Sequence, residues 1–494
     1  MGRLGYGWRV FSLVAACILA LSVVASASTY YIDYAAGSDS ANGTSPTTPW
    51  QHMPGMQGCA ANCAKTTPKA GDKIILKGGV TWPNAVFPIT WTWNGSSGSY
   101  IYIGVDKTWY AGSSWARPIF NAGGTPITGS MNAFIKGWAI SYVQWDNLEI
   151  TGFNTNISYP TGYCATFNAG TYVTVSNWYV HGWSHTGVTE DGFHCLWGGA
   201  TPTGDIIEYS VFDGSDSTGG GDSGGMTYTW PTVIYSIFHD MPNAVLLNGH
   251  GEVGNNLIYN IKADFDGVTH ANAIETLGGD GGNYYIHDNL IHDVSLGEPM
   301  FLGGQPMTVY VWNNVIWNIP NASTWMDARF SNWTGYYFNN TIVPYPGNPC
   351  FVQGGTTYNP TFTLENNHCI TTGAFANVVS SNLTLTTNVV MTPTQAAAAG
   401  YSVTQTNVYS PTSSNCSGQR NCPVGVGTNA TSVWPSGYST NDTSYSCTQS
   451  AANQVVCPAR TTALRSTRWD AGAYLYSASG GGPARPTNLR AAVH

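Results

Sequence analysis

Carboxyl and imidazole groups are concentrated in the middle of this chain of 494 residues. Of its 26 acidic residues, 18 lie between positions 141 and 300, and eight of its 11 histidines lie in the same stretch. Lys262 and Arg329 are the only lysine and arginine from position 141 to position 410. Such a surplus of carboxylates can transfer protons in acid–base catalysis or hold a cation. The middle of the chain is therefore where a reactive site is expected.

A pair of carboxylates is predicted on one face of this region. Seven short apolar segments between 192 and 355 align by their alternation, which turns Ile274 and Met300 inward and the following residues outward. The outward column contains His194, Thr227, Leu246, Glu275, Phe301, Asp327 and Phe351, and a second one contains Asn248, Arg329 and Gln353. Two stacked strands apart, Glu275 and Asp327 would lie roughly 9 to 10 Å from each other. Inverting glycosidases hold their acid and base at a similar separation. The alternative is two unrelated, solvated carboxylates.

The connections that precede these segments add a base and cation ligands. Asp264 and Asp266 are suited to calcium, which takes carboxylate oxygens, and Asp222 is a third such residue. Removal of a proton α to a carboxylate needs a base and a cation that neutralises the carboxylate. Lys262, two residues before Asp264, is the candidate base, and His194 and His270 are further catalytic candidates, His270 as acid or base. Each has a structural alternative: an Asp-Gly turn, an exposed lysine, or a histidine that bonds the next coil.

Five further polar residues of the same region are assigned to ligand binding. They are Asp191, Asn248, His250, Asp280 and Gln353.

A repeating all-β architecture must position these residues. An alternating apolar strand, an asparagine-containing turn and a second short apolar strand recur roughly every 20 to 33 residues. The copies are 142–150, 172–180, 205–212, 231–238, 251–259, 283–291, 308–316, 334–342, 361–369 and 382–390. In a parallel β-solenoid each coil adds one strand to every sheet, about 4.8 Å from the previous coil, and loops of varied length explain the uneven spacing. The units are too short for propeller blades, and the Gly-rich hairpins of an antiparallel sandwich do not punctuate them.

Asparagines recur at the turn within each copy. They are Asn147, Asn177, Asn255, Asn289, Asn313, Asn339, Asn366 and Asn388. Asparagine tolerates the left-handed backbone that such turns need, and its amide can hydrogen-bond along a ladder of coils. We interpret these asparagines as structural and not as catalytic.

The first residues are typical of an exported protein. Arg3 and Arg9 precede an apolar run over 10–24 and the small residues of 25–27, which predicts a signal peptide over residues 1–28. The formal net charge of −9 argues against nucleic acid as a partner, because phosphate binding needs clustered lysine and arginine. We expect a secreted monomer, extracellular or periplasmic, with no membrane partner once the signal peptide is removed.

Ten cysteines remain after the signal peptide, and an even number in an exported chain favours disulfides over buried thiols. Short separations favour the pairs Cys59–Cys63, Cys416–Cys422 and Cys447–Cys457, although the connectivity stays open. The Cys-containing segment 411–476 is expected to cap the last coils of the solenoid, since an open end exposes unpaired strand edges. The Gly/Pro-rich residues 477–494 are expected to form a flexible tail.

Both ends of the chain resemble a known family. Residues 29–53 (TYYIDYAAGSDSANGTSPTTPWQHM) and 70–82 (AGDKIILKGGVTW) are similar to the N-terminal cap of secreted bacterial β-helix proteins of the pectate-lyase-like superfamily. Residues 468–476 (RWDAGAYLY) are similar to the closing segment of the same proteins. The resemblance implies a right-handed parallel β-helix of about ten or more coils, which we place over 29–410 together with its N-terminal cap.

The resemblance also implies a class of activity. The superfamily contains polysaccharide lyases, glycoside hydrolases, epimerases and non-enzymatic adhesins, so fold alone does not choose among them. It implies a secreted enzyme that cleaves an extracellular or cell-wall polysaccharide, with lyase-type β-elimination on a uronate-containing glycan placed first. The base in such lyases is commonly lysine or arginine and calcium is the cofactor, which points to Lys262 and Arg329. The alternatives are hydrolysis by Glu275 and Asp327, and a non-catalytic glycan-binding or surface protein.

Overall fold

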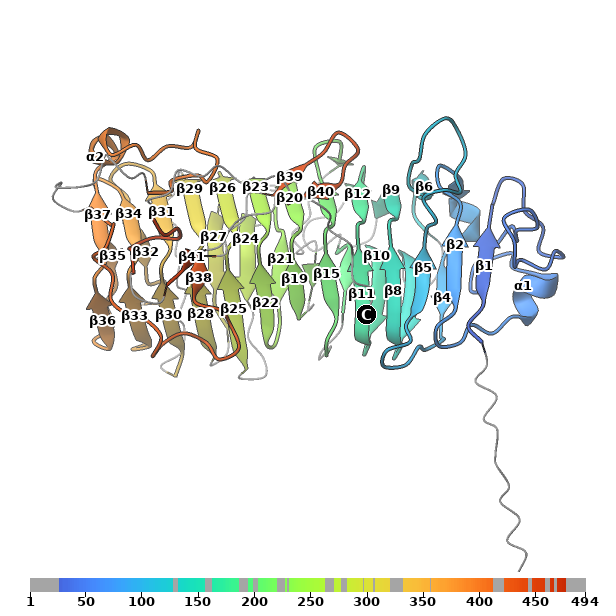
Figure 1. Ribbon diagram of the computed structural model, residues 1–494, viewed down its shortest axis with the longest axis horizontal. Helices are drawn as coiled ribbons and strands as arrows, with labels where there is room; N and C mark the ends of the chain where they lie inside the picture. The colour runs from blue at the N-terminus through green and yellow to red at the C-terminus, as the bar shows by residue number, and fades with distance from the viewer. Residues whose placement is uncertain are drawn as a thin grey trace, which may run out of the picture.

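The strands of the repeat are stacked along one long axis in this computed structural model (Figure 1). The structure describes residues 26–127, 132–155, 162–185, 194–198, 203–219, 227–228, 231–262, 271–276, 282–295, 297–304, 307–319, 332–355, 357–411, 422–442, 447–457, 463–465 and 469–476. The predicted signal peptide up to residue 25 and the predicted tail from 477 therefore lie outside the described residues.

Three sheets form the body of the protein, and they are named here in the order in which a coil visits them. The 13-stranded first sheet consists of β1 (Thr29–Ile32), β2 (Lys73–Leu76), β5 (Ile101–Gly104), β8 (Ser141–Asp146), β11 (Thr171–Ser176), β15 (Ile206–Glu208), β19 (Thr232–Ile234), β22 (Gly251–Gly254), β25 (Asn283–His287), β28 (Thr308–Trp312), β30 (Thr334–Phe338), β33 (Thr361–Glu365) and β36 (Leu383–Thr386). The 14-stranded second sheet consists of β3 (Thr81–Pro83), β6 (Ile119–Thr125), β9 (Glu149–Thr155), β12 (Tyr179–His181), β13 (Ser184–His185), β16 (Val211–Asp213), β17 (Thr218–Gly219), β20 (Ile237–Met241), β23 (Leu257–Ile261), β26 (Leu290–Val294), β29 (Val315–Ile319), β31 (Thr341–Pro344), β34 (His368–Ile370) and β37 (Val389–Met391). The eight-stranded third sheet consists of β4 (Ile89–Trp91), β7 (Asn132–Trp138), β10 (Gly162–Asn168), β14 (Leu196–Trp197), β18 (Thr227–Tyr228), β21 (Val245–Leu247), β24 (Ala271–Thr276) and β27 (Gly297–Leu302).

Few other elements accompany the three sheets. They are the helices α1 (Ala61–Lys65) and α2 (Pro393–Ala398), the 3-10 turn η1 (Asn84–Val86), the parallel pair β32 (Phe351–Val352) and β35 (Ala376–Asn377), and two antiparallel pairs, β38 (Asn441–Asp442) with β41 (Ala463–Leu464) and β39 (Thr448–Gln449) with β40 (Val455–Val456). The body is therefore a parallel β-helix, right-handed as crossovers between parallel strands are. The predicted fold is confirmed, and the 13 strands of the first sheet agree with ten or more coils.

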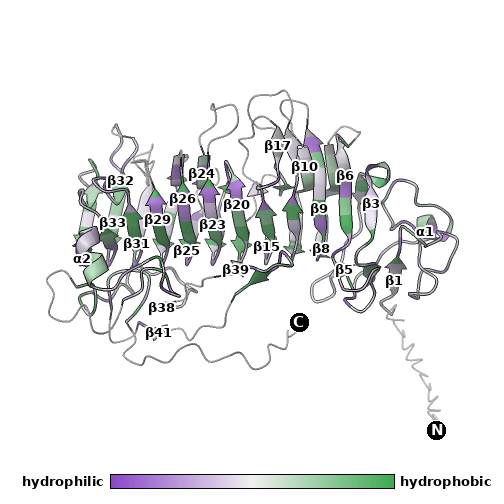
Figure 2. Cartoon of the chain, turned by 90° about the horizontal axis from the view of Figure 1, so that it is seen from above, coloured by the Kyte–Doolittle hydropathy of each residue, from purple (hydrophilic) through white to green (hydrophobic). Residues whose placement is uncertain are grey.

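Apolar side chains from successive coils stack inside the helix. In the first sheet one inward column, in register from strand to strand, consists of Val175, Ile207, Val233, Val253, Ile286 and Val311. All six side chains are at most 2% exposed. In each strand the residues directly before and after this inward residue point outward. This alternation is the period of two that the repeat predicts. Figure 2 shows hydrophobic residues along the whole stack.

A ladder of buried asparagine amides runs along the turn between the first and second sheets. Its rungs are Asn256, Asn289, Asn314, Asn340, Asn367 and Asn388. Each amide nitrogen donates to the amide oxygen of the next rung at 2.9 to 3.1 Å. The same oxygen also accepts the backbone N–H of the preceding rung. The ladder thereby satisfies, coil after coil, polar groups that would be costly to bury unpaired.

The predicted turn asparagines occupy two adjacent positions and not one. Asn147, Asn177, Asn255, Asn313, Asn339 and Asn366 have the left-handed backbone, with φ from 54° to 57°. Asn289 and Asn388 instead belong to the ladder, because Asp288 and Thr387 take the left-handed position in their coils. The structural interpretation holds for both positions, but the sequence alignment merged them, since the turns from Asn255 onward carry two consecutive polar residues.

The C-terminal segment contacts the side of the helix from the early coils at Arg117 to the late coils at Glu365. The cap that the sequence predicts over residues 411–476 stays a prediction. We call residues 422–457, as far as they are described, the C-terminal strap. Later residues of the strap contact earlier coils of the helix. Thr428 donates to Glu365 at 2.7 Å, and Gln449 contacts His239 at 3.0 Å. Arg117, in the early coils, donates to the backbone oxygens of Ala452 and Asn453 at 3.0 and 2.9 Å. Figures 1 and 2 place β39 beside the middle coils, whereas α2 lies at the end of the stack.

The strap covers a buried histidine on the outward face of the first sheet. His287 stacks on Trp312 with 4.4 Å between the ring centroids, and Tyr438 of the strap packs against it at 5.3 Å. Its Nδ1 lies 2.8 Å from Asp288 and its Nε2 lies 3.0 Å from Glu252. Burial alone would lower the pKa of His287, but the hydrogen bonds and charges of Asp288 and Glu252 outweigh it and raise this pKa to about 9. The imidazolium is thus the stable form under the strap.

Disulfides tie the chain locally and between coils. The predicted pairs Cys59–Cys63 and Cys447–Cys457 are confirmed, and Cys422 is disulfide-bonded while its predicted partner Cys416 lies outside the described residues. Two further bonds, Cys164–Cys195 and Cys350–Cys369, join neighbouring coils across 31 and 19 residues. Disulfides form and persist in oxidising compartments, so they are consistent with export.

Among the described residues no helix is both long enough and apolar enough to cross a membrane.

The asparagine ladder yields a stability prediction. Asn314→Ala removes both the amide nitrogen that donates to the next rung and the amide oxygen that accepts from the previous one. The amide and backbone N–H groups of Asn289 then lose their acceptor. Each buried group left unpaired costs about 1–3 kcal/mol, so we expect a loss of at least 2 kcal/mol in the free energy of unfolding. Asn388→Ala, at the half-exposed last rung, is the matched control and should cost less because water reaches it. Urea unfolding of the three proteins measures this, and equal losses in the two variants would contradict the ladder's role.

The raised pKa of His287 yields a pH prediction. Its folded pKa lies above the value of about 6.5 for an unfolded histidine. The stabilisation is therefore fully present below about pH 6.5 and is lost as pH rises through about 9. We expect the difference in melting temperature between the wild type and His287→Gln to shrink over that range. His292→Gln is the control, because burial lowers the pKa of His292 despite its bond to Asp293, so its difference should not shrink there. A His287→Gln difference that stays constant from pH 6 to pH 10 would refute the charged form.

Candidate functional site

The outward face of the third sheet brings chemically useful side chains into one column. Strand pairing places one outward residue of each strand in register, which gives the column Lys136, Thr166, Trp197, Tyr228, Leu246, Glu275 and Phe301. With strands about 4.8 Å apart, the five steps from Lys136 to Glu275 span about 24 Å. We call these seven residues the third-sheet column. A cation, three large aromatic rings and a carboxylate thus share one face.

The sequence alignment of this face was correct at its centre and slipped at both sides. Leu246, Glu275 and Phe301 are in register as predicted, and Ile274 and Met300 point inward with no exposure. Thr227 pairs with Val245 and is fully buried, so the column position belongs to its neighbour Tyr228. A slip of one residue exchanges the two faces of a strand, and the two-residue strand β18 offers too little pattern to fix it.

His194 and Phe351 also lie away from the predicted column. His194 precedes β14 by two residues, and Trp197 takes the column position on that strand. Phe351 is 1% exposed in the core, where it packs against Tyr337 and Phe375. Its strand β32 pairs only with β35, because the third sheet as described ends at β27. These two placements correct the predicted column at its two ends.

Glu275 is held by amide groups on the same face. Its side chain is 7% exposed, and Asn272 donates to its Oε2 at 3.1 Å. The oxygen of Asn272 accepts the backbone N–H of Glu298 on the next strand at 3.2 Å, and Asn243 on the previous strand accepts the backbone N–H of Asn272 at 2.6 Å. The contacts to Asn243 and Glu298 fix Asn272, and Asn272 in turn orients the carboxylate of Glu275, which is therefore preorganised.

Aromatic rings flank the column between Lys136 and Glu275. Tyr163 stacks on Trp197 with ring centroids 5.3 Å apart, and His194 packs against Tyr228 at 4.9 Å. Trp197 and Tyr228 are both half-buried, so each still presents part of its surface outward. Aromatic side chains with an apolar body and a polar edge are suited to binding amphipathic ligands at a wet surface.

Lys136 is a functional candidate that the sequence reasoning missed. It makes no hydrogen bond or ion pair within the described part of the chain, and burial lowers the pKa of its ammonium below the ordinary lysine value. Two residues on, along the same face, the side chain of Trp138 is 67% exposed. Lys136 lies on β7, just before the first sequence copy of the repeat at 142–150, and therefore outside the stretch in which the sequence places the reactive groups. Its place on the preceding strand is the signal that could have found it.

The other predicted site residues with described positions are dispersed. Lys262 follows β23 at the edge of the second sheet, where its ammonium lies 3.2 Å from Asp240. Asn248 is half-buried and His250 exposed just after β21. Gln353 is 5% exposed, and its amide bonds to the backbone of Gly355, Tyr358, Val379 and Ser380. Asn248 follows Leu246 of the third-sheet column by two residues, as Trp138 follows Lys136, whereas Lys262 and Gln353 make their contacts away from this column.

The remaining predicted residues lie outside the described residues. They are Asp191, Asp222, Asp264, Asp266, His270, Asp280, Asp327 and Arg329.

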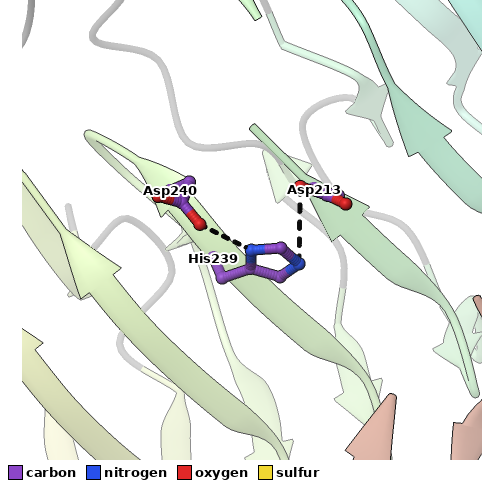
Figure 3. Close-up of side chains that lie close together, drawn as sticks. All are labelled: Asp213, His239 and Asp240. Atoms are coloured by element: carbon purple, nitrogen blue, oxygen red, sulfur yellow. Dashed lines mark hydrogen bonds and ion pairs between the residues drawn. The ribbon is translucent and has the colours of Figure 1, made fainter. Parts of the chain in front are cut away.

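A second cluster occupies the outward face of the second sheet (Figure 3). Asp213, His239 and Asp240 each offer a ligand atom, all within 4.8 Å of one another. His239 lies between the carboxylates, with Nδ1 2.8 Å from Asp240 and Nε2 3.5 Å from Asp213. Calcium takes six to eight oxygen ligands, so this set, with an imidazole at its centre, does not fit calcium. No step in the chemistry below is therefore derived through calcium.

Comparison with known proteins adds a likeness in fold. No family model and no curated protein matches the chain. Among solved structures it is similar to a rhamnogalacturonan lyase at 14% identity, covering 73% of this chain and 87% of that one with a TM-score of 0.41. It is similar to a pectate lyase at 15% identity, covering 91% and 98% with a TM-score of 0.43. A lacto-N-biosidase from Eubacterium ramulus matches at 11% identity over 74% of this chain and 68% of that one, with a TM-score of 0.39. The likeness concerns the fold.

Proposed function

We propose that the protein is a secreted carbohydrate-active enzyme that cleaves an extracellular polysaccharide bound along the third-sheet column. The reaction we place first is lyase-type β-elimination on a uronate-containing glycan. The observation that carries the proposal is the coexistence, on one face, of a half-buried lysine with no partner among the described residues, outward aromatic rings and an oriented carboxylate. The span of about 24 Å from Lys136 to Glu275 suits an extended polymer better than a small molecule.

Lys136 supports the elimination reaction as the base. In that reaction the C–H bond α to the uronate carboxylate breaks, its electron pair forms the new C=C bond, and the glycosidic oxygen leaves with a proton. A base works best when its pKa lies near the working pH, and burial moves the pKa of Lys136 in that direction. Lys262, the base favoured by the sequence, lies 3.2 Å from Asp240 on the second sheet and away from the third-sheet column, which makes it the weaker choice. Asp222, Asp264 and Asp266 remain the proposed calcium ligands.

The direct test is cleavage of a panel of polysaccharides with and without EDTA. Growth of the ultraviolet absorbance of an unsaturated uronate indicates elimination, whereas new reducing ends without that absorbance indicate hydrolysis. Neither signal, together with retention on a glycan column, would indicate a non-catalytic binding protein and would refute the enzyme. Loss of cleavage in EDTA that added Ca²⁺ restores and added Zn²⁺ does not would support the calcium ligands proposed from the sequence.

Lys136→Met tests the base. Removal of a general base lowers the rate about 10²–10⁴-fold, so we expect a loss of that size in kcat. In the wild type, activity should rise with pH toward an apparent pKa below the ordinary lysine value, since only the neutral amine accepts the proton. Lys65→Met, at an exposed position in α1, is the matched control and should keep full activity. A fully active Lys136→Met enzyme would remove Lys136 from the mechanism.

Hydrolysis is the second candidate, and the carboxylate of Glu275, which the amide of Asn272 holds, favours it. An inverting hydrolase needs two carboxylates on either side of the bond, and the sequence proposed Asp327 as the partner of Glu275. Glu275→Gln keeps the hydrogen-bonding shape toward Asn272 and removes the charge. If hydrolysis is the reaction, reducing ends should fall at least 100-fold in this variant, with Glu149→Gln on the second sheet unchanged. If elimination is the reaction, Glu275→Gln should instead change KM more than kcat.

A further inference from the structure

His239 is surrounded by oxygen atoms on both of its ring nitrogens. Nδ1 lies 2.8 Å from Oδ2 of Asp240, its neighbour in the chain. Nε2 lies 3.0 Å from Oε1 of Gln449 in the C-terminal strap and 3.5 Å from Oδ1 of Asp213 on the adjacent strand. Figure 3 shows the imidazole ring between the two carboxylates. The side chains of His239 and Asp213 are 7% and 10% exposed, so little solvent reaches the group.

The hydrogen-bond roles around this ring leave a place for a cation. When Nδ1 donates its proton to Asp240, Nε2 carries a lone pair. That lone pair faces two oxygens, which are themselves acceptors. The amide of Gln449 is oriented by its nitrogen, which donates to Oδ1 of Asn453 at 2.9 Å and so turns Oε1 toward the ring. Three lone pairs that point at one another need a positive charge between them, either a proton on Nε2 or a metal ion.

The donor spacing fits a small tetrahedral ion. Zinc binds imidazole nitrogen and carboxylate oxygen at about 2.0–2.1 Å, which puts neighbouring tetrahedral donors about 3.3 Å apart. The distances from Nε2 to the oxygens of Gln449 and Asp213, 3.0 and 3.5 Å, lie on either side of that value. Three protein ligands would leave a fourth position for water. Calcium, which prefers oxygen ligands in larger number, is not suited to it.

The surroundings of these ligands are those of a supported metal site. Asp240 orients the imidazole as the carboxylate in a carboxylate–histidine–metal arrangement does. Asp240 is itself held by Asn260 and by the ammonium of Lys262. Asp213 accepts the backbone N–H of Ser215 at 2.9 Å and the hydroxyl of Tyr179 at 3.2 Å. The charge of Lys262 offsets one of the two carboxylates, so one negative charge remains for the cation.

We propose that Asp213, His239 and Gln449 form a binding site for a divalent transition metal of the zinc type. Two of the ligands come from neighbouring coils, β16 and β20, and the third comes from β39, 210 residues after His239. The metal therefore fastens the hairpin of β39 and β40 to the middle of the β-helix. The site lies on the second sheet, apart from the third-sheet column, and its role is to hold the C-terminal strap in place.

The test uses the full chain, stripped with a chelator and then dialysed against Zn²⁺ or Co²⁺. We expect one metal ion per chain by elemental analysis, the strong visible absorption of four-coordinate Co²⁺, and a melting temperature that rises with free Zn²⁺. His239→Ala and Asp213→Asn should each weaken binding at least tenfold. Asp213→Asn keeps an oxygen for Ser215, and its circular dichroism shows whether it is folded, so it carries the test if His239→Ala does not fold.

His292→Ala is the matched control. His292 lies two coils further along the same outward column and also has Nδ1 on a neighbouring aspartate, 2.7 Å from Asp293. Within the described residues no carboxylate or amide meets its Nε2, and its ring stacks between Tyr259 and Trp317. This variant should bind one metal ion as the wild type does. The proposal is overturned if the wild type takes up no stoichiometric metal, if uptake survives in both site variants, or if acid alone stabilises the protein and Zn²⁺ has no effect.

Discussion

Every surface of this protein depends on the registration of one coil on the next, and the buried asparagine ladder is the interaction that fixes it. Each rung presents its oxygen to two N–H groups of the neighbouring coil and its nitrogen to an oxygen of the next. A coil displaced by one residue would leave these buried groups unpaired, at a cost of about 1–3 kcal/mol for each. The apolar columns stabilise the stack, but apolar contacts are not directional and tolerate more than one register.

The same registration assembles the functional candidates. Lys136 and Glu275 are 139 positions apart in the chain, yet each holds the same place in its strand. A polymer that lies along the axis therefore meets one new side chain about every 4.8 Å. The amide contacts around Asn272 resemble those of the ladder, because they too join neighbouring strands. Here they orient the carboxylate of Glu275, whereas in the ladder they pair polar groups of the core. A site built in this way lies on rigid strands and needs few residues from each coil.

The C-terminal strap makes contacts between residues that lie far apart in the sequence, up to 336 positions among the described residues. Positively charged side chains lie at several of the points where the strap contacts the helix. Arg117 donates to its backbone oxygens, and His287, whose pKa is raised, lies beneath its Tyr438. At His239 the oxygens of both the strap and the helix face one nitrogen, which is the basis of the proposed metal site. In a chain with a net charge of −9 such positive points are scarce, so they mark where the strap is held.

The sequence by itself determined the architecture. The period of two, the recurring turn asparagines and the two ends predict a parallel β-helix, and short separations predicted Cys59–Cys63 and Cys447–Cys457. It also placed Leu246, Glu275 and Phe301 in one column, because the apolar inward residues of β21, β24 and β27 can be recognised from the sequence and fix the position of their outward neighbours. These features are local, or they repeat so often that errors in one copy are corrected by the others.

Only the tertiary structure decided which residues from distant coils meet. It exchanged Thr227 for Tyr228, moved Phe351 into the core, and separated Asn289 from the left-handed turn position. A strand of two residues does not fix its own register, and a slip of one residue reverses its faces. It also added Lys136 to the site and brought Gln449 to His239, since contacts across 210 residues leave no periodic trace in the sequence. The stacking of the repeats determines the fold. The register of the short strands and the path of the non-repeating C-terminal strap determine the sites.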